Sequence, residues 1–316
     1  MAHVKSSALV RYAWLSIVVA IITISIKAGA YLLTGSVSLL SDAMESVVNL
    51  VAAIIALIAL KLAAAPATSR YTFGRSKAEY FSAAVEGAMI FGAAALIFIA
   101  AITRLFHPQP VTHLGWGLLA SVLATILNGI TGLYLRHIGR RERSLTLEAD
   151  GIHLLTDVLT TLGVILGLSL ALITHWDFLD PLIAICVALN IITTGIKLLR
   201  QALAGLLDVT LPDEENACIV ATLRTFTRPG QISFHGLQTR RAGRYRHIKV
   251  DLQVPGQWSV QAGHDLAMQV EEAIGQSLDS SYVVIHVEPI EDAQSYTDIP
   301  EGYVPLGDDE GLRPIP

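Results

Sequence analysis

The stretch EADGIHLLTD, residues 148–157, places a histidine and three acidic residues at the start of a long apolar run. The run continues to Ile173 with no further ionisable residue, so a helix formed by it is long enough to cross a bilayer. His153 and Asp157 are four residues apart and therefore share one face of that helix. Because ionisable groups inside a membrane span are costly, the pair is a candidate functional site.

A second stretch, SLLSDAMESVVN at residues 38–49, repeats the arrangement, since Glu45 and Asn49 are also four residues apart. Two helices packed through these faces would bring three oxygen-type groups and one imidazole nitrogen to one point. That donor set suits a borderline dication. Glu45 and Asp157 supply about two negative charges, which one dication neutralises. The alternative is that both pairs form interhelical hydrogen bonds without a metal.

The composition of the chain agrees with a membrane protein. Of its 316 residues, 53% are hydrophobic and 16% are charged, against about 25% charged in soluble domains. The long apolar runs are confined to residues 12–203. They lack two-residue alternation, which predicts helices rather than barrel strands. We predict six spans: Tyr12–Leu33, Leu39–Lys61, Tyr80–Ile102, Leu114–Leu135, Glu148–Ile173 and Leu179–Leu199.

The distribution of Lys and Arg between the connections predicts the orientation. Arg104 is the only clear cation on one side. The first apolar run has no signal-peptide cleavage pattern, so we expect it to be retained as a span. Cytoplasmic loops carry the excess of basic residues, so we expect both termini in the cytoplasm and the bundle in a bacterial-type inner membrane. The basic side holds Lys5, Arg11, Arg70, Arg75, Lys77, Arg136, Arg140, Arg141, Arg143, Lys197 and Arg200.

Further ionisable residues within the predicted spans include Asp42, Asp150, Lys27 and Glu86. Asp42 and Asp150 come about one turn before the two polar pairs, and we expect them to cap their helices or face water. Lys27 in the first span and Glu86 in the third are expected to pair with each other or to extend to an interface.

The chain after the sixth span reads as a soluble domain. Its elements follow the order α-β-β-α-β, which suits a small α/β sandwich with helices on one face of a sheet. We therefore predict a transport domain at 1–207, a cytoplasmic domain at 208–292 and an acidic, proline-containing disordered tail at 293–316. The predicted elements are Asp213–Thr225, Phe234–Arg241, Tyr245–Val254, Ser259–Leu278 and Tyr282–Pro289.

The two polar stretches, together with YTFGRSKAE at 71–79 and DPLIA at 180–184, resemble the cation diffusion facilitator family of zinc and iron exporters. The resemblance covers residues from about 10 to 290. It implies a homodimer in the lipid bilayer, with a six-helix bundle and a cytoplasmic domain of metallochaperone-like α/β fold. It also implies export of Zn²⁺ or Fe²⁺ in exchange for protons, with no prosthetic group. The transport ligands it implies are Glu45, Asn49, His153 and Asp157.

The resemblance also assigns residues outside the transport site. A salt bridge between Lys77 and Asp208 is expected to tether the domains near the membrane surface. Well-known members have Asp or His at the position of Glu45 and Asp at the position of Asn49, which leaves the choice of metal open. A loop metal site of some relatives is expected to be absent. The implied cytoplasmic metal ligands are His235, Asp251, His264, His286 and Glu288.

Two other functions use the same polar core. One is a monovalent-cation/proton antiporter, which is favoured by the smaller number of carboxylates that results from the neutral Asn49. The other is a membrane-anchored metal sensor that signals through its cytoplasmic domain. An enzyme is not expected, because no nucleophile and base stand together. The net charge of -5 gives no reason to expect nucleic acid, and the two distant cysteines do not form a zinc-site motif.

Overall fold

The computed structural model describes residues 2–34, 37–106, 116–174, 176, 178–297, 299 and 302–306. The chain divides into two compact units, 1–206 and 207–316, each with its own internal contacts. The first unit is helical, and the second combines helices with a small sheet.

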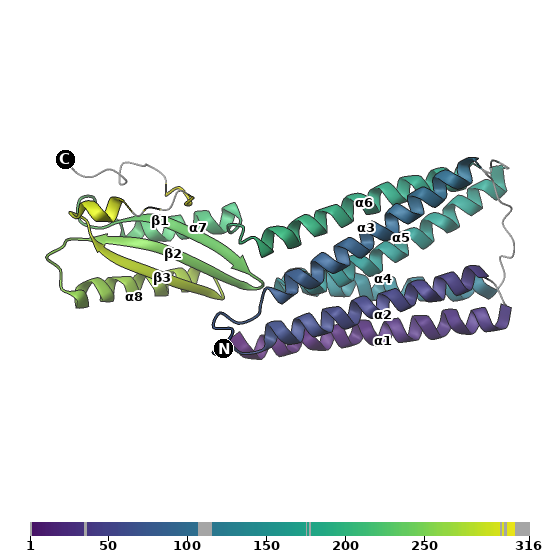
Figure 1. The fold of residues 1–316 in the computed structure, drawn as a ribbon, viewed down its shortest axis with the longest axis horizontal. Helices are drawn as coiled ribbons and strands as arrows, with labels where there is room; N and C mark the ends of the chain where they lie inside the picture. Colours follow the sequence, from purple (N-terminus) through teal and green to yellow (C-terminus); the bar gives the residue numbers. More distant parts are fainter. Residues whose placement is uncertain are drawn as a thin grey trace. The chain divides into compact units, whose positions relative to one another are not determined.

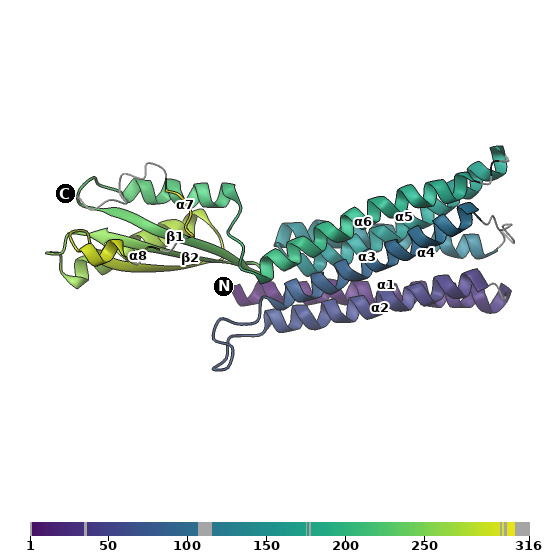
Figure 2. The ribbon, with the colours of Figure 1, turned by 45° about the horizontal axis from the view of Figure 1, so that its top comes forward.

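The first unit is a bundle of six long helices (Figure 1). Figures 1 and 2 show α1 beside α2, and α3 packs most extensively against α6. All six predicted helices are present, and each extends past its predicted window at one or both ends. Their bounds are α1 (Ala2–Thr34), α2 (Val37–Ala64), α3 (Ala78–Phe106), α4 (Trp116–Glu142), α5 (Leu145–Thr174) and α6 (Leu179–Leu206).

The prediction of six spans is confirmed only in part. Within the described residues, three helices are long and apolar enough to cross a membrane: Leu9–Leu32, Ala78–Thr103 and Pro181–Leu206. A shorter apolar helix segment, Asn49–Ala64, belongs to α2.

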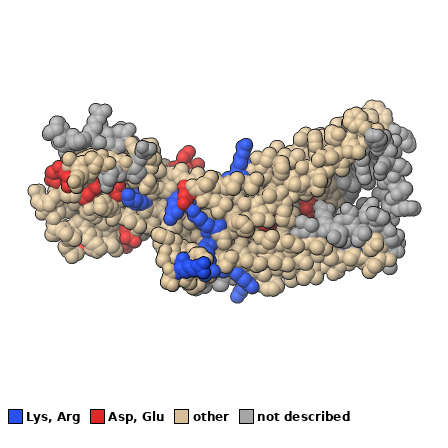
Figure 3. All heavy atoms as spheres, viewed as in Figure 1, with Lys and Arg blue, Asp and Glu red and all other residues tan. Residues whose placement is uncertain are grey.

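The bundle has an apolar exterior and polar groups inside. On the face drawn in Figure 3, its Lys and Arg side chains gather towards one end. Such a surface suits a lipid environment, because the polar groups of a membrane protein are placed in the interior of its helix bundle. Exposed apolar side chains include Val18, Leu96, Leu123, Ile130, Leu166 and Leu189. Buried polar side chains include Ser16, Asn49, Glu86, Asn128, Asp150 and His153.

Glycines allow two pairs of helices to touch through their backbones. At the α3–α6 contact, a Cβ on Gly87 would lie 3.1 Å from the backbone nitrogen of Leu199. At the α4–α5 contact, a Cβ on Gly151 would lie 2.5 Å from the nitrogen of Arg136 and 2.7 Å from the oxygen of Gly132. Small residues at such crossings are the usual means of close helix packing in membranes. The α4–α5 seam fixes the helix that carries His153 and Asp157.

The second unit contains the predicted α-β-β-α-β order. Strands β1 (Ser233–Ala242) and β2 (Tyr245–Val254) are antiparallel, and β3 (Ser281–Pro289) lies parallel to β2. The parallel pairing requires a crossover, which α8 (Val260–Ser277) supplies. Helix α7 (Asp213–Phe226) and α8 pack against one core with the sheet, with Ile219, Leu223, Val270 and Ile274 fully or almost fully buried.

The described part of the tail is ordered, which differs from the predicted disorder. A short 3-10 helix, η1, spans Ala293–Tyr296. Beyond it, the backbone nitrogen of Val304 donates to Leu237 O at 2.7 Å, and the Arg224 guanidinium donates to Leu306 O. Val304 and Leu306 also pack against the core of the domain. Two apolar side chains thus hold this segment against β1 and α7. The prediction for 307–316 lies outside the described residues.

Candidate functional site

Asn49 joins the two polar faces that the sequence singles out. Its Oδ1 lies 2.8 Å from His153 Nε2, and its Nδ2 donates to Asp157 Oδ2. Because the amide nitrogen faces the carboxylate, the amide oxygen accepts, and His153 Nε2 must carry the proton of that contact. Asn49 and His153 are buried, with 5% and 6% of their surfaces exposed. Three of the four predicted transport ligands therefore meet between α2 and α5.

Glu45 lies in α2, one helical turn before Asn49. Its side chain is outside the described residues, as is that of Asp42. The spacing puts Glu45 on the face of α2 that carries Asn49. Its role as the fourth ligand stays a prediction.

Three threonines surround Asp157 in α5. Thr160 and Thr161 donate to the backbone oxygen of Asp157 at 2.8 and 2.9 Å, and Thr156 donates to Ile152 O at 2.9 Å. Such bonds from Thr to the preceding turn satisfy the hydroxyls inside an apolar bundle and tend to bend a helix. The carboxylate of Asp157 thus sits on a stretch of α5 whose backbone carbonyls are already engaged.

Two buried carboxyl groups lie near this cluster, and the sequence predictions for both are wrong. Asp150 was expected to cap α5 or face water, yet it is 1% exposed and accepts from Ser16 Oγ at 3.1 Å. Glu86 does not extend to an interface, because it is fully buried and accepts from Ser82 Oγ at 3.1 Å. The sequence offered no signal for Ser16 or Ser82 beyond a serine within an apolar run.

In the second unit, a row of polar side chains crosses the sheet. Asp251 on β2 pairs in register with His235 on β1 and with His286 on β3. His235 Nε2 lies 2.5 Å from Glu288 Oε1, and His286 Nε2 lies 3.9 Å from Glu288 Oε2. The neighbouring Lys249 approaches Asp251 Oδ1 at 3.6 Å. Four of the five predicted cytoplasmic ligands thus share one region of the sheet.

The fifth predicted ligand, His264, is exposed near the start of α8. Across the part of the chain that the structure describes, no three or more His, Cys, Asp or Glu side chains are grouped closely enough to hold a metal ion. The side chain of Glu45 lies outside that part. The cytoplasmic metal site therefore stays a prediction.

The residues predicted to tether the domains each have a partner within their own unit. Lys77 Nζ donates to Leu206 O at 3.2 Å. Asp208 Oδ2 accepts from Arg240 at 3.0 Å. A pair between Lys77 and Asp208 would join the two units, and it stays a prediction.

Comparison with known proteins covers both units. A family model described as the cation efflux transmembrane domain matches residues 13–207, and one described as the cation efflux protein cytoplasmic domain matches residues 211–290. An uncharacterized transporter of Synechocystis sp. is 46% identical over 285 residues, which are 90% of this chain and 92% of that protein. The cation-efflux pump FieF of Escherichia coli (strain K12 / DH10B) is 32% identical over 264 residues, 84% and 87% of the two chains.

Two solved structures are similar to a smaller part of the chain. One, described as a putative zinc transporter, CzrB, is 37% identical and covers 25% of this chain and 96% of its own, with a TM-score of 0.24. The other is the metal-bound C-terminal domain of the CzcD transporter from Thermotoga maritima. It is 30% identical, covers 25% and 92% of the two chains, and has a TM-score of 0.23.

Proposed function

The chain belongs to the cation diffusion facilitator family of cation efflux transporters, and on that premise we propose that it exports a divalent transition-metal ion in exchange for protons. We propose zinc or iron as the transported metal, because imidazole ligands favour them over manganese. The family is one of transporters rather than enzymes.

The contact of Asn49 with His153 and Asp157 carries the proposal. It supports a site at which an imidazole, a carboxylate and an amide oxygen converge between two helices, with Glu45 as the fourth ligand. Only an imidazole nitrogen without a proton binds a metal, so metal entry requires His153 Nε2 to give up the proton it donates to Asn49. The same amide would then turn its oxygen from the imidazole to the metal.

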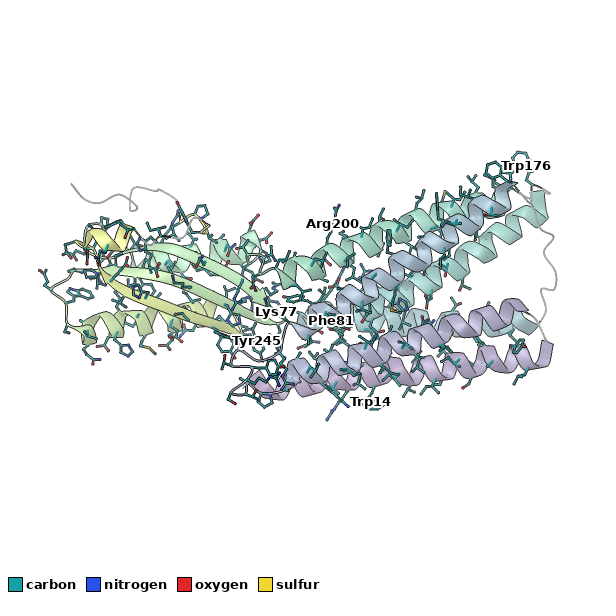
Figure 4. All side chains as sticks on the ribbon, in the orientation of Figure 1. Trp14, Lys77, Phe81, Trp176, Arg200 and Tyr245 are labelled. Carbon is teal, nitrogen blue, oxygen red and sulfur yellow. The ribbon has the colours of Figure 1, made fainter. Side chains whose placement is uncertain are left out.

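The transport cycle follows from the position of this site. The metal enters from the cytoplasm, the bundle rocks around the fixed ligands, and protons return on the inward step. The distribution of basic residues supports cytoplasmic termini in an inner membrane. Lys77 and Arg200 lie towards one end of the bundle, whereas Trp176 marks the opposite end (Figure 4). We further propose a homodimer, with the ligands of the cytoplasmic row and the Lys77–Asp208 pair acting in regulation.

Metal flux tests the proposal directly. Wild-type protein in liposomes with an imposed pH gradient should move zinc or iron, and Asp157→Ala should abolish this flux. The matched control is Asp265→Ala, which removes an exposed carboxylate on α8. This variant should transport the metal as wild type does. Full transport by Asp157→Ala would contradict the site assignment. Absence of flux for every dication in wild-type protein would instead favour the metal sensor.

The bridging Asn49 favours one competing function. A neutral amide at the centre of the cluster lowers the local negative charge, which suits a monovalent cation better than a dication. Sodium flux that zinc fails to inhibit would identify a monovalent-cation/proton antiporter. Inhibition of any sodium flux by micromolar zinc would support the divalent site.

A further inference from the structure

Glu86 is a carboxyl group embedded in an apolar cluster of the bundle. It is fully buried, and it lies on the same face of α3 as Ala83 and Ile90, which belong to the cluster that also contains Ala149 of α5. Its Oε1 accepts from Ser82, whereas its Oε2 is buried without a hydrogen-bond partner. The position of α3 is fixed there, because the next residue, Gly87, is at the backbone contact with α6.

Asp150 of α5 is the companion of Glu86. Ala149, the neighbour of Asp150 in α5, belongs to the same apolar cluster as Ala83 and Ile90 of α3, so the two carboxyl groups stand on helices that pack together there. Asp150 Oδ1 accepts from Ser16, and Asp150 Oδ2 is buried without a hydrogen-bond partner. Two unsatisfied carboxyl oxygens from different helices therefore occur in one part of the bundle interior. Asp150 also stands one turn before His153, so its charge links Glu86 to the proposed metal site.

No basic side chain that the structure describes forms an ion pair with either carboxyl group. Two ionised carboxylates in an apolar interior without a cation carry a large free-energy penalty. At least one of them must bind a proton when no metal is near. On the helices packed against α3, the basic residues Lys61, Lys197 and Arg200 are exposed, and the side chains of Asp42 and Glu45 are not described. His153 of α5 contacts Asn49, and Glu79 of α3 accepts from Ser144.

We propose that Glu86 is a proton-carrying residue of the transport cycle, separate from the metal ligands, with Asp150 as the charged group that couples it to them. The proposal rests on the proposed metal/proton exchange. In the metal-free state, Glu86 is a carboxylic acid. When the dication enters, the O–H bond of Glu86 breaks, the proton leaves to water, and the electron pair stays on the carboxylate. When the metal leaves, the carboxylate takes a proton from the opposite side.

This assignment bears on the amide in the proposed ligand set. Asn49 has a neutral side chain, and an amide cannot exchange protons in the way that a carboxyl group does. Glu86 places a titratable carboxyl group on α3, outside the cluster that α2 and α5 form. Glu86 thereby adds a proton-exchanging residue that does not touch the metal.

Proton counting on the purified full-length protein tests the proposal. Zinc is added in a weakly buffered solution with a pH-sensitive dye, and the protons released per bound zinc are measured for wild type, Glu86→Gln and Glu86→Asp. Glu86→Gln should bind zinc but release about one proton fewer than wild type, since metal binding is linked to proton loss. Glu86→Asp should restore the release. Glu79→Gln, the same change at a buried position of α3, should match wild type.

An unchanged proton count in Glu86→Gln would overturn the assignment. If that variant does not fold, the pH profile of zinc transport by Glu86→Asp decides, and a profile identical to wild type would equally overturn it. Failure of the proposed function is a different result, in which wild-type protein neither binds zinc nor releases protons.

Discussion

The polar cluster between α2 and α5 and the polar row across the sheet contain similar residues in different states. In the bundle, Asn49 joins His153 and Asp157 from positions more than a hundred residues away in the chain. In the sheet, His235 contacts a carboxylate directly, and Lys249 adds a cation beside Asp251. In the bundle, a neutral amide separates the imidazole from the carboxylate and lowers the local charge, whereas in the sheet a buried imidazole and a buried carboxylate meet directly. The same residue types can therefore meet either directly or through a bridging amide in buried surroundings.

The most severe way to break the bundle cluster is Gly151→Leu. The added Cβ would lie 2.5 Å from the backbone nitrogen of Arg136, so α4 and α5 must separate. We expect little folded protein and no transport, with a loss of about 3 kcal/mol or more from overpacking. Gly29→Leu is the control, because nothing lies within 4 Å of its added Cβ. Thermal melting followed by size-exclusion chromatography should separate the two variants, and equal melting temperatures would contradict the α4–α5 contact.

Glu288→Ala disrupts the row of polar side chains that crosses the sheet. The side chain of His235 is fully buried and would lose its carboxylate partner, which should destabilise the cytoplasmic domain by about 1–3 kcal/mol. Hydrogen exchange of β1 and β3 in the full-length protein should report this loss. Glu271→Ala, at an exposed position of α8, should leave exchange unchanged. Wild-type protection in Glu288→Ala would show that the contact contributes no stability.

Asn49→Asp should make the polar cluster between α2 and α5 resemble the polar row across the sheet, because a carboxylate would then replace the bridging amide. A third carboxylate among the proposed ligands should tighten zinc binding by about tenfold, equivalent to about 1.4 kcal/mol, and change the preference among metals. Calorimetric titration with a panel of dications measures both effects. Asn190→Asp is the control, because Asn190 is exposed on α6. Identical affinities for wild type and Asn49→Asp would show that Asn49 does not tune the site.

The smallest expected effect concerns Lys249. Its Nζ is 3.6 Å from Asp251, and the side chain is 47% exposed, so the pair contributes less than about 1 kcal/mol to stability. Lys249→Ala should leave the melting temperature unchanged but strengthen zinc binding to the cytoplasmic row a few-fold, because no lysine then competes with the metal for the carboxylate of Asp251. A fall in zinc affinity would exclude Asp251 as a ligand.

Much of the fold followed from local patterns. Continuous apolar runs indicated the six helices, and alternation with turn residues indicated the strands of the second unit. The spacing of His153 and Asp157 correctly placed them on one helix face that meets Asn49. The ordered tail was missed, because its composition is polar and only Val304 and Leu306 attach it.

The burial of Asp150 and Glu86 was also missed, for a related reason. Periodicity shows that two side chains share a face, but it does not show what that face packs against. Asp150 meets Ser16 because α1 approaches α5, and Glu86 is enclosed because α3 touches α6 through glycine. These neighbours are distant in the chain, so their identity is a property of helix packing.

The sequence alone therefore determined which segments are helices or strands, which ionisable groups lie in an apolar environment, and the family to which the chain belongs. Only the tertiary structure decided that Asn49 bridges His153 and Asp157 and that Glu86 and Asp150 are buried in the bundle. The physical reason is that hydropathy and period depend on neighbours along the chain. Hydrogen bonding and charge in the bundle depend on neighbours across it.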